Sequence, residues 1–339
     1  MSLIMGKTFA MFGAAVLLSS ALSVSAYAGC YDVVPLPRKV EVSGGEPFVL
    51  TGDVRILYEG KDLERNAGFL AGYISEMSGL ELETAELAAG ESAEGSIIMR
   101  CSRSASGSDE GYVISVGSGG IEIVSPSPAG VFYAVQTLRK SAAVLASGGR
   151  LAFPAARIED SPEFAYRGAH FDVCRHFFTE EEVKEYIDMM VLHNMNRLHW
   201  HITDDQGWRV EIKRYPELTE IGSVREETLT GHLNDRPEVY DGVPYGGFFT
   251  QDQIREIVKY AADRYVTVIP EVDLPGHMQA ALAAYPELGC TGGPYKVWTK
   301  WGVSEEVLCA GNDKVLEFLR NVFTEIMDLF PSEYIHIGG

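Results

Sequence analysis

A segment in the middle of the chain, residues 199–208, combines two histidines, two carboxylates and two tryptophans in the order HWHITDDQGW. The apolar residues at its start predict a strand that turns polar at its end. Side chains alternate along a strand, so His199 and His201 share one face and Trp200 lies on the other. Carboxylates can transfer protons, and flat indole faces can cover sugar rings. The segment favours a catalytic sugar site; the alternative is two core histidines beside a solvated Asp-Asp turn.

Polar or glycine residues follow each of four predicted strands in the second half of the chain. The strands are expected at 168–173, 196–203, 266–270 and 334–337, and their ends read DVCRHF, DDQGW, EVDLPGH and HIGG. The carboxyl ends of parallel strands meet at one edge, where barrel enzymes carry their chemistry. We therefore expect these side chains to lie together and to form the site.

Amphipathic helices alternate with these strands. Capping boxes predict helix starts at Thr179 and Thr250, and Asn312 or Asp313 caps a third helix. Alternating strands and helices imply parallel strands. The predicted fold class is therefore α/β, a (β/α)₈ TIM barrel whose first half, about four units, is expected at 161–339.

The region before the barrel has a different pattern. Residues 112–116 and 121–124 predict two strands joined by a Gly-Ser-Gly-Gly turn, and the apolar spacing at 69–77 and 131–138 predicts helices. No constellation of chemistry-bearing residues stands out here. We expect residues 29–160 to form a small α+β accessory domain.

The first 28 residues have the features of an export signal. A lysine precedes an apolar run at 9–22 that is short for a membrane span, and AYA at 26–28 fits a cleavage site. The segment 27–30 also resembles a bacterial lipoprotein box, which makes a lipid on Cys30 the expected route to any membrane attachment. The protein is expected to be exported, either periplasmic or lipid-anchored at the bacterial cell surface.

The composition is that of a globular, acidic protein. A length of 339 residues suggests about two domains, and 46% hydrophobic residues can build a large core. The formal net charge of −20 repels nucleic acid and anionic membrane surfaces, so neither is an expected partner. Among the five cysteines, Cys290 and Cys309 flank one long loop and are either a disulfide pair or free thiols.

Taken in order, the motifs of the second half resemble the family 20 glycoside hydrolases, the β-N-acetylhexosaminidases. The matching segments are YRG at 166–168, DVCRHF at 172–177, HWHITDDQGWR at 199–209, PEVDLPGH at 270–277 and HIGG at 336–339. Residues 129–138 are similar to part of the family's N-terminal accessory domain. Cys174 stands where the family usually has Ser or Ala, a change between small residues.

The resemblance implies substrate-assisted, retaining hydrolysis of a glycan that ends in β-linked N-acetylglucosamine or N-acetylgalactosamine. In the family, the acetamido oxygen of the sugar attacks the anomeric carbon and gives an oxazolinium intermediate. A Glu protonates the leaving oxygen and an adjacent Asp orients the acetamido group. This Asp-Glu pair directly follows His-x-Gly-Gly, so it would lie after Gly339, and residues up to Gly339 alone are expected not to hydrolyse glycosides. No cofactor and no metal is implied, and the oligomeric state stays open.

The resemblance also implies roles for particular residues. Asp204 and His277 match the Asp-His pair that holds the catalytic acid and sets its pKa. Arg175 matches the residue that binds two sugar hydroxyls, and its planar fork of donors suits that task. The predicted substrate-binding residues are Arg175, His201, Asp205, Glu271 and Asp273.

Other residues near these motifs have weaker assignments. The last four substrate-binding residues could equally brace the site through hydrogen bonds. Arg167 lies at the opposite end of its strand and is interpreted as structural. Trp298 and Trp301, in the loop after the third strand, are candidates for a sugar platform or for loop packing.

Two other functional classes compete with the glycosidase. His199 and His201, with Asp273 and His277, have ligand types that a divalent metal accepts, as in a metal-dependent barrel hydrolase. No further histidine or lysine at a strand end completes a two-metal site, which disfavours this hypothesis. The other class is a non-catalytic glycan-binding protein.

Overall fold

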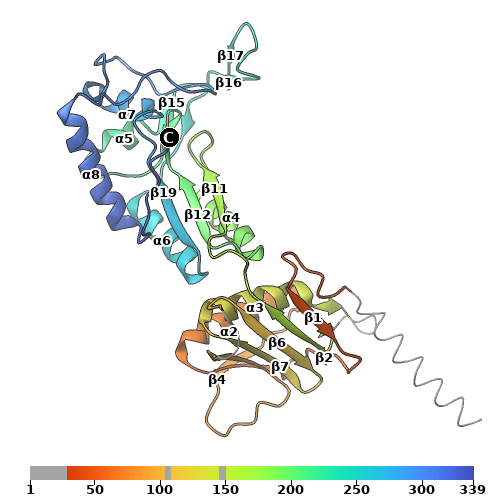
Figure 1. Ribbon diagram of the computed structural model, residues 1–339. Coiled ribbons are helices and arrows are strands. Elements are labelled where there is room, and N and C mark those ends of the chain that lie inside the picture. Colours follow the sequence, from red (N-terminus) through yellow and green to blue (C-terminus); the bar gives the residue numbers. More distant parts are fainter. Residues whose placement is uncertain (1–28, 104–107, 145–149) are drawn as a thin grey trace, which may run out of the picture. The chain divides into compact units, whose positions relative to one another are not determined.

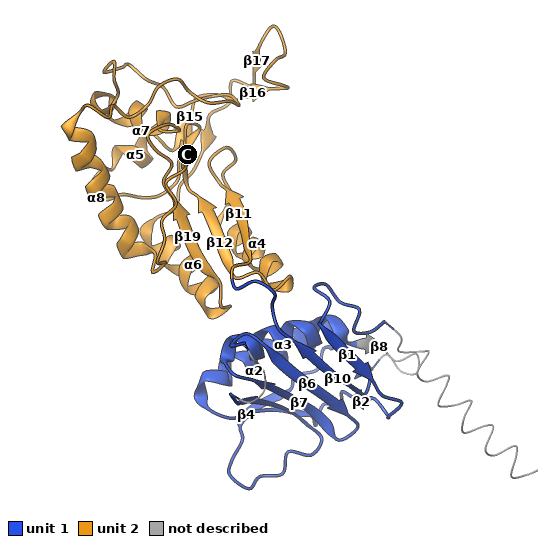
Figure 2. Cartoon of the chain, in the orientation of Figure 1, with its two compact units in different colours: residues 1–165 blue, residues 166–339 orange. Residues whose placement is uncertain are grey.

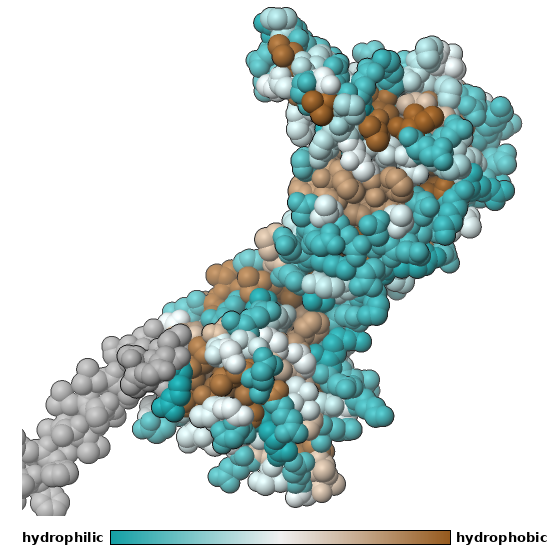
Figure 3. Space-filling model, turned by 180° about the vertical axis from the view of Figure 1, so that it is seen from behind, coloured by the Kyte–Doolittle hydropathy of each residue, from teal (hydrophilic) through white to brown (hydrophobic). Residues whose placement is uncertain are grey.

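The computed structural model describes residues 29–103, 108–144 and 150–339, and the chain forms two compact units, 1–165 and 166–339 (Figures 1 and 2). The predicted export signal lies outside the described residues. No helix in the described part is long and apolar enough to cross a membrane. Hydrophilic side chains cover most of the face drawn in Figure 3, and hydrophobic ones form separate smaller areas.

Unit 1 is built on a seven-stranded mixed sheet. In spatial order its strands are β1 (Lys39–Val42), β10 (Ala156–Asp160), β6 (Tyr112–Gly117), β7 (Gly120–Ser125), β5 (Ser96–Cys101), β3 (Arg55–Tyr58) and β4 (Glu83–Glu86). A small second sheet has the order β2 (Phe48–Val49), β9 (Leu151–Phe153) and β8 (Ala143–Val144). The helices α2 (Glu64–Ser78) and α3 (Pro128–Ser141) pack against each other and the large sheet, and η1 (Lys61–Leu63) precedes α2. The predicted hairpin and both predicted helices are confirmed.

The start of α3 shows why this region folds as it does. The Ser127 side chain accepts a hydrogen bond from the Gly130 nitrogen, and Pro128 occupies the first turn, where no N–H is needed. A Cβ on Gly130 would lie 2.1 Å from the Ser125 Oγ and 2.7 Å from the Gly111 oxygen. Only glycine therefore allows the helix to approach the sheet so closely.

Unit 2 contains three parallel strands in sequence order, β11 (Gly168–Asp172), β12 (Arg197–His201) and β19 (Thr267–Glu271). The helices α4 (Glu180–Leu192), α6 (Gln251–Asp263) and α8 (Asp313–Leu329) lie along the sheet (Figure 1). Both predicted capping boxes, at Thr179 and Thr250, are present, and Asn312 caps α8. Unit 2 is thus a mixed α/β unit with parallel strands.

Short elements lie in the loops that follow β12 and β19. They are β13 (Thr203–Asp204), β14 (Gly207–Trp208), α5 (Glu217–Glu220), β15 (Val224–Arg225), β16 (Leu229–Thr230), β17 (Val239–Tyr240), β18 (Tyr245–Gly246), α7 (Gln279–Ala284) and η2 (Pro286–Leu288). They form three two-stranded pairs, β13–β14, β15–β18 and β16–β17. These loops carry most of the site described below.

The fourth predicted strand, at 334–337, is wrong as a continuous strand. The segment makes a single parallel bridge, between His336 and Glu271. The His336 nitrogen donates to the Pro270 oxygen at 2.9 Å, and the Leu274 nitrogen donates to the Ile337 oxygen at 3.1 Å. The Val272 nitrogen also donates to the His336 oxygen at 3.0 Å, and among the described residues these bonds amount to one bridge and not to a continuous ladder.

The two cysteines of the long loop are neighbours. An antiparallel bridge between Gly289 and Leu308 adjoins both residues, and the thiols of Cys290 and Cys309 are hydrogen-bonded. Both thiols are free, and a hydrogen bond with Cys309 raises the pKa of the Cys290 thiol. A disulfide between them stays a prediction.

Candidate active site

The parallel register aligns three of the predicted polar residues at the strand ends. Asp172 pairs with His201, and His201 pairs with Glu271, across β11, β12 and β19. The His201 Nδ1 lies 2.6 Å from the Glu271 Oε2, and its Nε2 lies 2.6 Å from the Asp204 Oδ2. His201 is therefore held between two carboxylates, and all three side chains are buried.

Asp204 lies at the centre of the hydrogen-bond network of the site. Its Oδ1 accepts the Asp205 backbone N–H at 2.6 Å and lies 3.0 Å from the His277 Nδ1. Its Oδ2 lies 2.6 Å from the His201 Nε2 and 2.7 Å from the Arg175 Nη2. The buried carboxylate therefore joins Arg175, His201 and His277 into one network, as a residue that fixes an imidazole must do.

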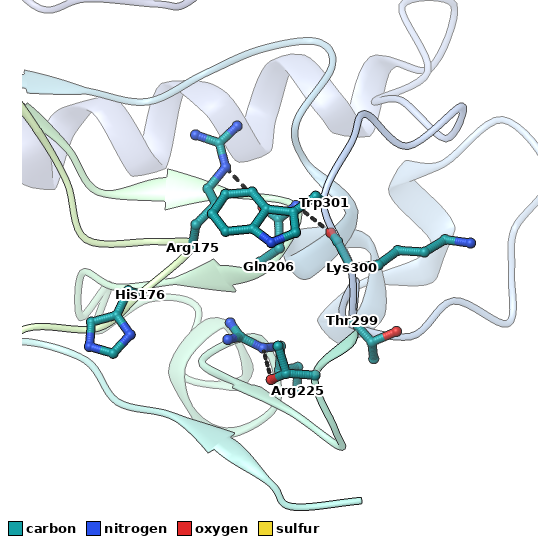
Figure 4. A pocket seen from close by; sticks show the side chains of 8 residues that line it. Arg175, His176, Gln206, Arg225, Thr299, Lys300 and Trp301 are labelled. Carbon is teal, nitrogen blue, oxygen red and sulfur yellow. Dashed lines mark hydrogen bonds between the residues drawn. The ribbon is translucent and has the colours of Figure 1, made fainter. Parts of the chain in front are cut away.

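Arg175 is fixed on three sides. Its Nη1 lies 2.7 Å from the Asp172 Oδ2, its Nη2 pairs with Asp204, and its Nε donates to the Gln206 Oε1 at 3.1 Å. Burial raises the pKa of Asp172, but the charge and hydrogen bond of Arg175 outweigh this and lower it. The side chain is still 24% exposed and lines a cavity of about 170 Å³, together with Gln206 and Trp301 (Figure 4). It is placed where it can meet a ligand.

The buried pair of His201 and Glu271 is strongly ionic. Burial lowers the pKa of His201, but its hydrogen bonds to Asp204 and Glu271 outweigh this and raise it to about 9. Burial raises the pKa of Glu271, but the hydrogen bond and charge of His201 and then of His199 lower it to about 2. The imidazolium of His201 is therefore held between carboxylates at neutral pH.

This geometry predicts how stability depends on pH. A histidine whose pKa is raised in the folded state adds stability that is full below its unfolded value and lost as pH rises. The contribution of His201 should be complete below about pH 6.5 and should disappear as pH rises through about 9. Urea unfolding of the unmodified chain and of His201→Gln should therefore differ more at pH 6 than at pH 10. An equal difference at both pH values, or a similar effect of the exposed-site control His232→Gln, would contradict the assignment.

Four of the five residues predicted to touch substrate are buried: His201, Asp205, Glu271 and Asp273. Asp205 is 0% exposed, and its two oxygens accept backbone N–H groups of Gln279 at 3.0 Å and Ser304 at 3.1 Å. It therefore anchors α7 and the loop before α8. His201 and Glu271 are likewise enclosed by other side chains, and contact with the substrate stays a prediction for all four residues.

Asp273 lies beside the HIGG motif. It is 8% exposed, and burial raises the pKa of its carboxyl. Gly338 has φ 78°, and a Cβ there would lie 1.6 Å from the Asp273 Oδ1. Gly338 therefore lets the backbone pass directly against the Asp273 carboxylate.

His170 and His336 lie near Glu271, and the sequence analysis gave neither of them a role. The Glu271 Oε1 lies 3.0 Å from the His336 Nδ1, and its Oε2 lies 3.9 Å from the His170 Nε2 and 2.7 Å from the His199 Nε2. With His201, four imidazoles therefore surround one carboxylate. The sequence signal that could have identified His170 is the alternation His170-x-Asp172, which matches His199-x-His201 on the next strand.

The tryptophans of the HWHITDDQGW segment do not face a ligand, contrary to the prediction. Trp200 is 0% and Trp208 1% exposed, and their rings lie 5.0 Å from Phe249 and 6.4 Å from Phe318, centroid to centroid. Trp200 packs in the core because it lies on the face of β12 opposite the histidines, whereas Trp208, on β14, packs against Phe318 of α8. Trp301 is 58% exposed and lies at the cavity of Arg175.

A second arginine, Arg209, ties the loops of the site together. It is 0% exposed, and burial lowers its pKa to about 10. Its Nε donates to the Val173 oxygen at 3.1 Å, its Nη2 to the Cys174 oxygen at 2.6 Å, and its Nη1 to the Gly247 oxygen at 3.0 Å. These carbonyls flank Arg175 and the segment before α6, so Arg209 fixes the position of the Arg175 loop.

Replacing Arg209 with Met should strongly destabilise unit 2. The variant keeps much of the volume but leaves several buried carbonyls without donors, each costing about 1–3 kcal/mol. We expect the free energy of unfolding to fall by about 3 kcal/mol or more, which corresponds to a melting temperature lower by roughly 6–12 °C. Calorimetry measures this, with the exposed Arg214→Met as the control. Equal melting temperatures for the two variants would show that Arg209 is not a structural anchor.

The four ligands of the metal hypothesis do not come together. Among the described residues, His201 and Asp273 group with Asp204, but His199 groups with Glu271 and His336, and His277 groups with Asp204 and Asp205. The ring nitrogens of His201 are both within hydrogen-bond distance of carboxylates. The arrangement thus matches a hydrogen-bonded network better than the predicted ligand set.

The sequence matches one family over nearly all of the described part. Residues 164–339 match "Glycosyl hydrolase family 20, catalytic domain", and residues 30–161 match "Glycosyl hydrolase family 20, domain 2". The beta-hexosaminidase of Porphyromonas gingivalis is 40% identical over 314 residues, which are 91% of this chain and 38% of that protein. The beta-N-acetylhexosaminidase of Cellulomonas fimi is 37% identical over 91% of this chain and 59% of its own length.

Solved structures agree with these matches. The family 20 beta-N-acetylhexosaminidase of Streptomyces coelicolor has a TM-score of 0.80 and 35% identity, covering 91% of this chain and 59% of that one. The Streptomyces plicatus enzyme, solved in complex with Thio-NAglucal, has a TM-score of 0.79 and 34% identity over the same shares. The chain therefore spans from two fifths to three fifths of the length of these relatives. By its motifs, its strand-end site and these matches, the chain belongs to glycosyl hydrolase family 20.

Proposed function

We propose that the protein containing this chain is an exo-acting β-N-acetylhexosaminidase that removes terminal N-acetylglucosamine or N-acetylgalactosamine from glycans. The observation that carries the proposal is the Asp204 carboxylate, which joins Arg175 and His277 at the ends of parallel strands. Relatives named beta-hexosaminidase support it, as does a Streptomyces plicatus variant solved in complex with product GlcNAc.

The proposed architecture is an eight-stranded barrel that begins with β11, β12, β19 and the segment at His336. Its first four β/α units would occupy 161–339, and residues 29–160 would be the accessory domain. The family membership and the order of the parallel strands support this arrangement. We further propose export through the signal at 1–28, with a lipid on Cys30 as the means of any membrane attachment.

The proposed mechanism divides the work among the residues of the network. Arg175, fixed by Asp172 and Asp204, binds two hydroxyls of the terminal sugar. His277, oriented by Asp204 at 3.0 Å, contacts the catalytic acid, a Glu expected directly after the HIGG motif with its neighbouring Asp. His201 holds Asp204 in place through a hydrogen bond, and Glu271 in turn holds His201. The acetamido oxygen of the substrate attacks the anomeric carbon, and the Glu protonates the leaving oxygen.

A substrate comparison tests this function. A protein that uses the acetamido group as nucleophile should hydrolyse 4-nitrophenyl N-acetyl-β-D-glucosaminide and should leave the β-D-glucoside, which lacks that group, essentially intact. Equal rates on both substrates would reject substrate assistance. Binding of N-acetylglucosamine without hydrolysis of either substrate would favour the non-catalytic glycan-binding alternative, and activity that a chelator abolishes would favour the metal-dependent hydrolase.

A further inference from the structure

The side chain of Gln206 connects two parts of the site that are far apart in the sequence. It is 4% exposed and lines the cavity of about 170 Å³ beside Arg175 and Trp301. Its Oε1 accepts a hydrogen bond from the Arg175 Nε at 3.1 Å, and its Nε2 donates to the Lys300 backbone oxygen at 3.0 Å (Figure 4). One amide group therefore links the guanidinium that follows β11 to the loop that contains Trp301.

These two contacts need a side chain with both an acceptor and a donor. An arginine Nε–H can only donate, and a backbone carbonyl oxygen can only accept. The amide of glutamine supplies one group of each kind, whereas an ionised glutamate supplies acceptors alone and a methionine supplies no donor. Because Gln206 is buried, both hydrogen bonds are protected from competing water. The residue type at this position therefore suits a bridge between the arginine and the loop.

The Trp301 loop, the segment from Trp298 to Ser304, is held at both ends by Asp205. The Asp205 backbone oxygen accepts the N–H of Trp298 at 2.9 Å, and the Asp205 Oδ2 accepts the N–H of Ser304 at 3.1 Å. Gln206 adds a third contact between these ends. The Trp301 side chain remains 58% exposed and lines the cavity. The backbone of the loop is therefore fixed while its indole is open to a ligand.

The contact with Gln206 also sets the plane of the Arg175 guanidinium. Asp172 lies 2.7 Å from its Nη1, and Asp204 lies 2.7 Å from its Nη2. Two contacts at the outer nitrogens leave a rotation about the line that joins them, and the third contact, at Nε, removes this rotation. A planar fork binds two hydroxyls well only when its plane points toward them. The Trp301 loop and the orientation of Arg175 are therefore linked through one side chain.

We propose that Gln206 is a positioning residue, which couples the Trp301 loop to the orientation of Arg175 so that the indole and the guanidinium hold the terminal sugar together. This inference rests on the proposed function, in which Arg175 binds two hydroxyls of that sugar. Without the bridge, the loop and the guanidinium move independently, and both contacts with the sugar weaken. Gln206 thus acts through Arg175 and needs no contact with the reacting atoms.

The first test is a double-mutant cycle between Gln206 and Arg175 in an active protein that contains this chain. We expect Gln206→Met to lower kcat/KM on 4-nitrophenyl N-acetyl-β-D-glucosaminide by about 10-fold or more, the effect of losing a hydrogen bond to a charged group. Lysine has no planar fork to orient, so the same substitution should have a much smaller effect in Arg175→Lys. The two losses should therefore not multiply, as expected of residues in direct contact.

Gln279→Met is the matched control for this cycle. Gln279 is also buried, and its Nε2 donates to the Lys296 oxygen at 2.8 Å while its Oε1 accepts a hydrogen bond from the Ser304 hydroxyl. These contacts support the same loop region but do not involve Arg175. The Gln206 bridge stays in place in this variant, so any loss that it causes should multiply with that of Arg175→Lys.

A second cycle tests the link to the loop. Trp301→Ala should lower kcat/KM in the unmodified protein, and its effect should be much smaller in Gln206→Met, where the indole is no longer aligned with Arg175. The exposed Val303→Ala, in the same loop, should leave kcat/KM unchanged in both backgrounds. If Gln206→Met does not fold, this cycle is measured with Gln206→Glu, which keeps the acceptor for Arg175 but has no donor for the Lys300 oxygen.

Three results would overturn the inference. The first is an unchanged kcat/KM in Gln206→Met, the second is a pair of losses in Gln206→Met and Arg175→Lys that multiply, and the third is an effect of Trp301→Ala that is equal with and without the bridge. Hydrolysis of the glucosaminide with any of these results would leave the proposed function standing. If the unmodified protein does not hydrolyse the substrate, the proposed function fails, and calorimetric Kd values for N-acetylglucosamine in the same variants decide the coupling.

Discussion

Replacing Arg175 with Ala in an active protein that contains this chain should reduce kcat/KM on a chromogenic N-acetylglucosaminide by about 100- to 10,000-fold. The side chain is expected to give two charge-assisted hydrogen bonds to the sugar, each contributing about 1.5–3 kcal/mol, and every 1.4 kcal/mol changes the rate constant tenfold. An unchanged kcat/KM would remove Arg175 from the site.

Two further variants show that the loss reflects sugar binding. Arg175→Ala also leaves Asp172 and Asp204 without their cation, so its melting temperature has to be measured beside its activity. Arg175→Lys keeps the positive charge but not the planar fork, and it should lose most of the same activity. Full activity in Arg175→Lys would mean that charge alone matters. The exposed Arg214→Ala should behave like the unmodified protein.

Asp204→Asn should lower kcat by about 100-fold or more while KM changes much less, because a positioned general acid contributes about 10²–10⁴-fold. The amide keeps the shape of the carboxylate but loses its charge. It can no longer accept from His201, His277 and Arg175 together, which the carboxylate contacts at 2.6, 3.0 and 2.7 Å. Steady-state kinetics on the same substrate separates the two parameters.

The pH profile distinguishes this role from a general loss of structure. If Asp204 acts on the acid through His277, the basic limb of the kcat profile should move in Asp204→Asn, whereas a structural defect would lower the whole curve. The exposed Asp252→Asn is the matched control and should leave the profile in place. A rise in KM with unchanged kcat would instead make Asp204 a binding residue.

The sequence was sufficient to predict which residues lie together at the strand ends. The carboxyl ends of parallel strands share one edge of the sheet, so only the order of strands and helices along the chain had to be known. Polar residues after β11, β12 and β19 had to share one edge once the strands were parallel, and His201 lies between Asp172 and Glu271 in register. The helix starts at Thr179 and Thr250 were equally readable, since a capping box is a local interaction.

Features that depend on long-range packing were not predictable in this way. The alternation of β12 separated Trp200 from the histidines, but it did not say which face the helices would cover. Arg209 is the last residue of the motif at 199–209, but the motif gave no sign of its structural role, because its partners are backbone carbonyls of distant loops. The segment at 334–337 has a strand-like composition, yet its pairing amounts to a single bridge.

A crystal structure of the protein with N-acetylglucosamine tests the central claim most directly. We expect a single sugar at the strand ends, with two ring hydroxyls within hydrogen-bond distance of the Arg175 guanidinium and the Asp204–His277 contact intact. A sugar bound elsewhere on the chain would contradict the assignment of the site. So would a metal ion coordinated by His201 or Glu271, because these side chains would then be ligands and not the support of Asp204.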